Sequence, residues 1–74
     1  MKMKDRPNVI KSEFLNDGSG LKYIEWAGSS RHSKPTNEIQ ANGCLFHEVD
    51  TGKIFAYDAG TQTWYEQIQL GGGS

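Results

Sequence analysis

Few side chains in this chain have the chemistry of a catalytic or metal-binding group. The sequence contains one cysteine and two histidines. Cys44 and His47 are three residues apart, and on a strand this spacing places them on opposite faces. A thiol–imidazole pair therefore cannot form within that strand. We expect Cys44 to be a buried structural residue and His47 to be solvated or paired across strands.

The spacing of the other candidates is equally uninformative for catalysis. His32 lies in a polar stretch, and no group of Cys and His residues has the spacing of zinc ligands. The glycine runs precede no predicted helix, so they do not indicate a phosphate-binding loop. The sequence predicts no catalytic residue, no metal site and no cofactor. We expect a protein that is not an enzyme.

Asp50 and Asp58 resemble a pair of catalytic carboxylates, but each is the first residue of a predicted turn. Asp50-Thr51-Gly52 predicts a type I turn in which Gly52 takes the left-handed position. Asp50 would then accept a hydrogen bond from the turn backbone. Asp58 and Gly60 indicate a second turn of the same chemistry. We interpret these four residues as turn-forming.

The aromatic side chains are the more informative group, because nearly all fall on predicted strands. Phe55 and Tyr57 share one face, whereas Trp64 and Tyr65 point to opposite faces. Either all of them fill one small core, or one face forms that core and the other meets a partner. The residues expected to supply core and partner interface are Trp26, Phe55, Tyr57, Trp64 and Tyr65.

Aromatic residues on a sheet could also bind sugars or bases. Sugar stacking would use Trp26, Trp64 and Tyr65, and we keep it as an alternative. Base stacking on Tyr57 or Trp64 needs flanking cations, and the last predicted strand has none. A surface glycan is therefore the alternative ligand, and we expect no binding to nucleic acid.

The elements that position these residues are read from alternation and turn signals. Residues 21–27, 44–49, 54–58 and 63–70 have the pattern of strands. The last three predict an antiparallel meander, to which residues 21–27 add a fourth strand. Residues 28–38 are polar and predict a long loop that contributes nothing to the core. The expected fold is all-β, a small antiparallel meander of three to four strands.

The ends of the chain lack this pattern. Residues 1–20 predict an extended N-terminal arm, with a short helical turn near 10–16 as an alternative, and residues 21–70 form the meander domain. Residues 71–74 are Gly-rich and predict a flexible tail. Residues 1–34 carry a net charge of +3 and residues 35–74 one of −4. We expect Lys2, Lys4 and Arg6 to make the contacts of the arm.

Length and charge limit the function classes. A chain of 74 residues buries a small core, and its single cysteine cannot form an internal disulfide. Association with copies of itself or with a larger body is the remaining route to stability. The chain shows no secretory signal and no apolar run of the roughly 20 residues that span a bilayer. With a net charge of −1 it has no general attraction to nucleic acid or membrane.

One stretch resembles a known module. The stretch is Asn42-Gly43-Cys44-Leu45-Phe46-His47-Glu48-Val49-Asp50-Thr51-Gly52-Lys53-Ile54-Phe55-Ala56-Tyr57-Asp58, followed by Thr63-Trp64-Tyr65-Glu66-Gln67. It is similar to a hairpin module in small head- or fibre-associated structural proteins of tailed bacteriophages. The likeness covers residues 20–68. Cys44 stands where a small polar residue is common, and Phe55 where Tyr is common.

The resemblance implies a non-enzymatic virion structural protein. We expect a capsid decoration protein that binds the head shell in many copies. Its partners would be the major capsid protein or other virion proteins, with homo-oligomers, and its location the virion assembled in the host cytoplasm. The alternatives are a fibre or tail module and a carbohydrate-binding adhesion module.

Overall fold

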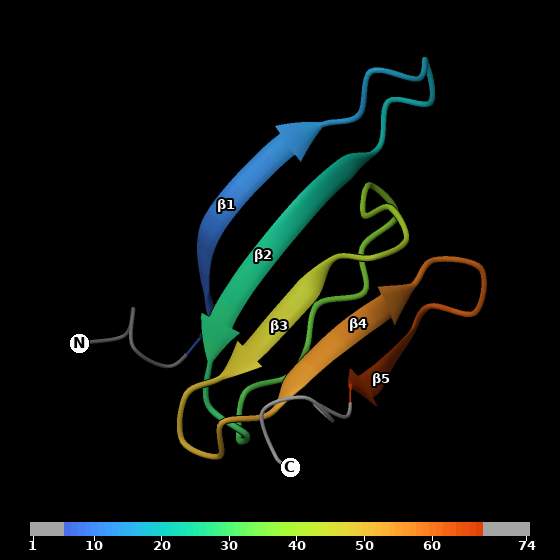
Figure 1. The fold of residues 1–74 in the computed structure, drawn as a ribbon. Coiled ribbons are helices and arrows are strands. Elements are labelled where there is room, and N and C mark those ends of the chain that lie inside the picture. Colours follow the sequence, from blue (N-terminus) through green and yellow to red (C-terminus); the bar gives the residue numbers. More distant parts are fainter. Residues whose placement is uncertain (1–5, 68–74) are drawn as a thin grey trace, which may run out of the picture.

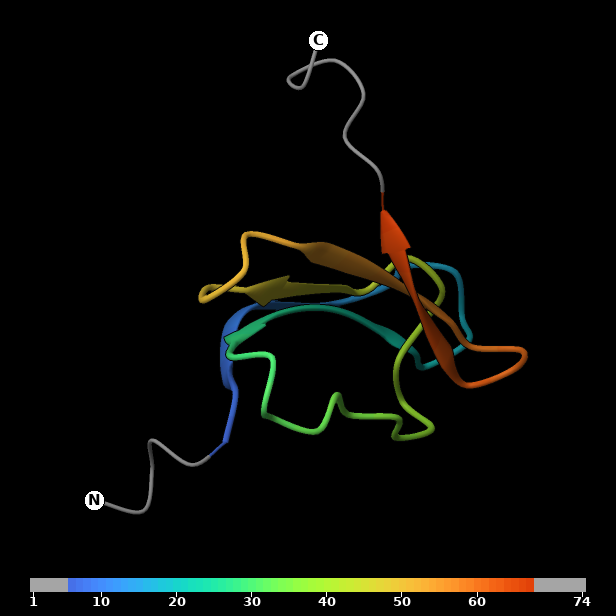
Figure 2. The same cartoon turned by 90° about the horizontal axis from the view of Figure 1, so that it is seen from below.

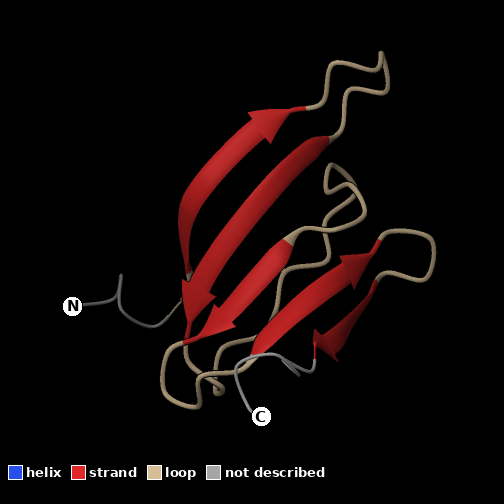
Figure 3. Ribbon diagram, in the orientation of Figure 1, coloured by secondary structure: helices blue, strands red, loops and turns tan. Residues whose placement is uncertain are grey.

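The computed structural model describes residues 6–67, and these form one five-stranded sheet (Figure 1). In chain order, which is also the order across the sheet, the strands are β1 (Asn8–Phe14), β2 (Lys22–Gly28), β3 (Leu45–Glu48), β4 (Ile54–Asp58) and β5 (Thr63–Gln67). All regular structure in this range is strand, so the all-β prediction is confirmed (Figure 3). The described range contains no helix long and apolar enough to cross a membrane.

Strands β3, β4 and β5 form the antiparallel meander that the sequence predicts. In the first turn Gly52 has φ = 80°, as predicted for the left-handed position, and its N–H donates to the Glu48 carbonyl at 2.8 Å. In the second turn the Asp58 carboxylate accepts hydrogen bonds from the Gly60 N–H and the Thr61 hydroxyl. If this turn had the same chemistry as the first, Gly60 would adopt the left-handed conformation. Gln62 adopts it instead, at φ = 54°.

The prediction of a wholly antiparallel sheet is also wrong. Strand β2 pairs with β3 in parallel, with Trp26 opposite Phe46 and Gly28 opposite Glu48. A parallel pair needs a connection of a dozen or more residues to bring the chain back to the same end of the sheet. Residues 29–44 provide that length, and the sheet is mixed.

A strand lies within the range 1–20 that the sequence predicts as an extended arm. Residues Asn8–Phe14 are strand β1, paired antiparallel with β2, and neither an arm nor a helical turn. The register shifts between Val9 and Lys11, so Ile10 is the extra residue of a β-bulge. All residues of β1 are exposed, because this strand lies at the edge of the sheet.

The connection 29–44 runs across one face of the sheet, as Figure 2 shows. Gln40, which belongs to this connection, is buried. Its side chain accepts a hydrogen bond from the Trp26 indole at 2.7 Å and donates one to the Pro35 carbonyl at 2.9 Å. The Trp64 indole donates to the same carbonyl at 2.8 Å. The polar loop therefore closes the core through hydrogen bonds, contrary to the expectation that it contributes nothing.

The core lies between this connection and the sheet. Its buried apolar residues are Ile24, Ala41, Cys44, Phe46 and Tyr57. Trp26, Ala59 and Trp64 pack against the cluster of Ile24, Cys44 and Tyr57. Cys44 is fully buried, as predicted, and its Sγ accepts the Ile24 N–H at 3.3 Å. The rings of Tyr57 and Trp64 are 4.9 Å apart.

Candidate partner-binding surface

The two faces of the sheet differ in what covers them. The face that carries Trp26, Phe46 and Trp64 lies under the connection 29–44, whereas no described segment crosses the opposite face (Figure 2). We call this second surface the open face. Strand alternation and register place its residues: Tyr23, Glu25, Ala27, Leu45, His47, Ile54, Ala56, Tyr65 and Gln67, with Asn8, Lys11 and Glu13 from β1.

Apolar side chains occupy the middle of the open face. The register aligns Leu45, Ala56 and Tyr65 in one row across β3, β4 and β5, and His47 and Ile54 in the next. Leu45, Ala56 and Ile54 are half-buried by their neighbours, and Tyr65 is 53% exposed. An apolar patch on a sheet without a covering layer is the kind of surface that binds other proteins.

Polar groups border this patch on the side of β1 and β2. Lys11 lies opposite Glu25, and the Tyr23 hydroxyl donates to the Glu25 carboxylate at 2.5 Å. Burial, with the neighbouring Glu25 carboxylate, raises the pKa of Tyr23 to about 12. The patch therefore has an apolar centre and a polar border, as protein interfaces commonly do.

His47 lies at the centre of the open face, between Ala27 and Ile54. Its Nε2 is buried and has no hydrogen-bond partner among the described residues. The imidazole, expected to be solvated or paired across strands, is half-buried, and its cross-strand neighbours are Ala27 and Ile54.

The structure divides the aromatic residues predicted to form core and interface. Tyr57 is 3% exposed, and Trp26 and Trp64 pack on the same core. The half-buried Phe55 faces the covered side and lies 4.2 Å from the Lys34 ammonium. Only Tyr65 of this group lies on the open face, and the other four lie on the covered side.

This division also separates the residues predicted to bind sugar. Trp64 and Tyr65 are neighbours on β5 and point to opposite faces. Trp26 and Trp64 use their indole N–H groups within the protein. The three residues do not form one platform for a sugar ring.

The sequence missed the polar pair that holds the connection on the sheet. Lys34 donates to the Glu48 carboxylate at 2.6 Å, and the Thr51 hydroxyl donates to it at 2.7 Å. These bonds hold the pKa of Glu48 below its ordinary value. Strand alternation could have placed Glu48 on the covered face beside Phe46, but the sequence carries no sign of its partner.

Asp50 has a partner outside the turn that the sequence did not predict. Its two carboxylate oxygens accept hydrogen bonds from the N–H and the hydroxyl of Ser30, at 2.9 and 2.6 Å. These bonds lower the pKa of Asp50. The turn between β3 and β4 is thereby attached to the start of the connection.

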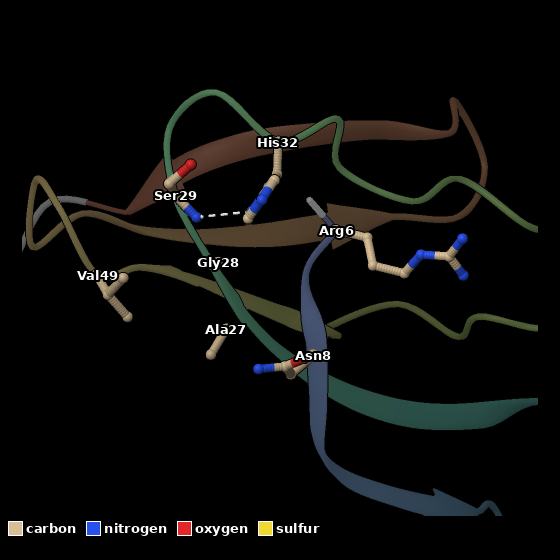
Figure 4. Close-up of a pocket in the computed structure, with 7 residues that line it drawn as sticks. All are labelled: Arg6, Asn8, Ala27, Gly28, Ser29, His32 and Val49. Carbon is tan, nitrogen blue, oxygen red and sulfur yellow. Dashed lines mark hydrogen bonds between the residues drawn. The ribbon is translucent and has the colours of Figure 1, made fainter. Parts of the chain in front are cut away.

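A pocket of about 280 Å³ lies at the end of β2 (Figure 4). It is lined by Arg6, Asn8, Ala27, Gly28, Ser29, His32 and Val49. The Ser29 N–H donates to His32 Nδ1 at 2.9 Å, and the Arg6 side chain extends away from this bond. The pocket does not bring several charged groups to one point.

Residues 6–67 offer no group of three or more His, Cys, Asp or Glu side chains that could hold a metal ion. Of the three cations predicted to contact a partner, Arg6 lies at the pocket, and Lys2 and Lys4 fall outside the described residues. The predicted strand end 68–70 and tail 71–74 also fall outside them. Comparisons with protein-family models, curated proteins and solved structures give no match. The open face is the surface best built for binding.

Proposed function

We propose that this protein is a non-enzymatic structural subunit that binds a larger assembly through its open face. The observation that carries this proposal is the apolar centre of that face, formed by Leu45, Ile54, Ala56 and Tyr65 around His47. A single sheet covered on one side leaves this centre in water, and a partner surface would remove it from water.

The resemblance of residues 20–68 to a bacteriophage hairpin module supports a virion as the assembly. We propose a decoration protein that binds the head shell in many copies. A sheet face suits this role, because many copies can lie flat on a repeating surface. Leu45 and Ala56 lie side by side on this face, and the exposed Tyr65 ring beside them provides a typical interface anchor.

The test measures binding to phage heads directly. Purified labelled protein is mixed with heads from the phage whose genome carries the gene, after the native copies have been stripped, and bound protein is measured by sedimentation. We expect saturation at a copy number that matches the capsid lattice. Failure to bind stripped heads would contradict the head-shell proposal.

Two variants test the face itself. Tyr65→Ala and Ala56→Glu should each weaken head binding by about tenfold or more, because they remove an anchor or add a charge at the apolar centre. Ile39→Glu is the matched control, since Ile39 is 39% exposed and belongs to the connection 29–44, which crosses the opposite face. Equal loss of binding in the control and in Ala56→Glu would show that the open face is not the binding surface. Circular dichroism confirms that each variant is folded.

A further inference from the structure

Among residues 6–67, no segment pairs with the outer side of strand β1. It is the first strand in the sheet order, its partner in this range is β2, and every residue in it is exposed. Three of its apolar side chains, Val9, Ile10 and Phe14, are 50%, 56% and 62% exposed. An edge strand of this kind is a template for an added strand.

The hydrogen bonds of β2 identify which backbone groups of β1 face outward. Lys22 and Ile24 direct their N–H groups away from β1, to the Ile39 carbonyl and to Cys44 Sγ. In an antiparallel pair the alternate residues bond to the neighbour. Ser12 and Phe14 lie opposite Ile24 and Lys22, so their N–H and C=O groups point to the open edge.

The residues between are already bonded to β2. Lys11 and Glu13 lie opposite Glu25 and Tyr23. The Leu15 N–H continues this set, since it donates to the Leu21 carbonyl at 2.9 Å. An incoming strand must therefore bond to Ser12 and Phe14, and it meets Lys11 and Glu13 only through their side chains.

The sequence of β1 is complementary to itself in that arrangement. The residue types are arranged symmetrically about Ser12: apolar, basic, polar, acidic and apolar, in Ile10-Lys11-Ser12-Glu13-Phe14. We propose that this edge binds the same edge of a second copy, antiparallel and centred on Ser12, so that two sheets join into one. This inference is independent of the proposed function.

The centred register satisfies the outward groups of Ser12. Ser12 and the partner's Ser12 exchange two backbone hydrogen bonds on the twofold axis, and such a pair is symmetric by construction. Lys11 lies opposite the partner's Glu13 on the open face, in a pair without backbone bonds, where side chains approach most closely. By symmetry the same ion pair forms twice.

The apolar residues also match. Phe14 lies opposite the partner's Ile10, so the two most exposed apolar side chains of the strand cover each other. In the single chain Lys11 and Glu13 are only 3.9 Å apart in a solvated pair, with side chains 50% and 65% exposed. Dimerisation exchanges this weak pair for two cross-strand pairs. The edge is short, so we expect a weak dimer with a dissociation constant between about 10 µM and 1 mM.

The first test reverses charges. Sedimentation velocity of the full chain over this concentration range should show a reversible dimer. Glu13→Lys should raise the dissociation constant about tenfold, because Lys11 then faces a lysine twice. The double variant K11E/E13K should restore it to within about threefold of the original, because both pairs between the two copies are again of opposite charge. A monomer at 1 mM, or a double variant as weak as Glu13→Lys, would overturn the proposal.

The second test locates the axis. Under mild oxidation Ser12→Cys should form a disulfide-linked dimer, because paired residues at this position have Cα atoms about 5.5 Å apart. Thr63→Cys, on the other edge strand β5, is the matched control and should remain monomeric. Cys44 is buried and does not compete. Equal crosslinking of the two variants would refute the β1 interface.

Discussion

Replacing Glu48 by glutamine should loosen the connection 29–44 from the sheet. Glu48 accepts the Lys34 ammonium at 2.6 Å, and the exposed fractions of the two side chains are 6% and 18%. The Lys34 ammonium also lies 4.2 Å from the centre of the Phe55 ring. A hydrogen bond between charged groups contributes about 1.5–3 kcal/mol to folding, so we expect Glu48→Gln to cost about 2 kcal/mol. In a domain of this size that corresponds to a fall in Tm of about 8–16 °C.

The pH dependence gives a sharper result than the magnitude. The pKa of Glu48 is lowered from 4.5 in the folded state, with the Lys34 hydrogen bond as the largest cause. Its stabilisation is therefore complete above about pH 4.5 and is lost as the pH falls through the lower folded-state pKa. Glu48→Gln should remove this part of the acid-induced loss of stability. Asp17, whose pKa is also lowered, lies in another turn and contributes equally to both proteins.

A second variant removes the cation and keeps the carboxylate. Lys34→Met keeps an apolar stem over the aromatic rings but leaves the buried Glu48 carboxylate without its cation. The Lys34 hydrogen bond is the largest cause of the lowered pKa of Glu48, so this pKa should rise towards its ordinary value, while the Thr51 hydrogen bond still lowers it. This variant should therefore lose less stability than the natural protein as the pH falls below about 4.5.

Urea unfolding, followed by tryptophan fluorescence at several pH values, measures all three proteins. Trp64 is a direct reporter, because its indole donates to the Pro35 carbonyl beside Lys34. Glu66→Gln is the matched control: its pair with Lys53 is 3.9 Å long and half exposed, and its loss should cost less than about 0.5 kcal/mol. A Glu48→Gln cost as small as this control, or one unchanged between pH 7 and pH 3, would refute the reasoning.

Three further changes test local packing and backbone. Gly28→Ala should destabilise the fold by about 1–3 kcal/mol in urea unfolding, because a Cβ there would lie 2.7 Å from His32 Nδ1 and 3.1 Å from Phe46 Cζ; a neutral effect would contradict this close approach. Gln62→Gly should raise Tm, since glycine adopts φ = 54° without the roughly 1–2 kcal/mol penalty of other residues, and a lower Tm would argue against the left-handed turn. Cys44 should react with a thiol reagent only at the rate of unfolding, whereas immediate reaction would show that it is accessible.

The meander of β3, β4 and β5 could be predicted because its signals are local. Alternation indicated which side chains share a face, and the turn with Gly52 joined neighbouring strands. The opposite orientation of Trp64 and Tyr65 follows from the same period of two. Contacts between strands adjacent in sequence need little information beyond the strands themselves.

Strand β1 was not predicted from the sequence, because its bulge interrupts the alternation of side chains that marks a strand. The shift between Val9 and Lys11 adds one residue, so Val9, Ile10 and Phe14 fit neither a strand nor a helix pattern. All residues of the strand are exposed, and therefore no buried side chain marks it. Its place in the sheet depends on pairing with β2, which local propensity does not encode.

The candidate binding surface was predicted only in outline. The sequence placed aromatic residues on both faces, but it could not tell which face the connection 29–44 would cover. Gln40 and the Pro35 carbonyl decide this by binding the indoles of Trp26 and Trp64. These hydrogen bonds join polar groups that are far apart in the chain. The pattern of hydrophobic residues in the sequence does not predict them.

The sequence by itself determined the all-β class, the alternating faces of the strands and the left-handed Gly52, since each depends on steric preferences within a few residues. Only the tertiary structure decided that β2 and β3 run parallel, that Lys34 reaches Glu48, and that the open face is the one carrying Tyr65. These features depend on long-range pairing. The loop-closure entropy and the desolvation of each polar group are offset only when the complete sheet and its covering connection form together.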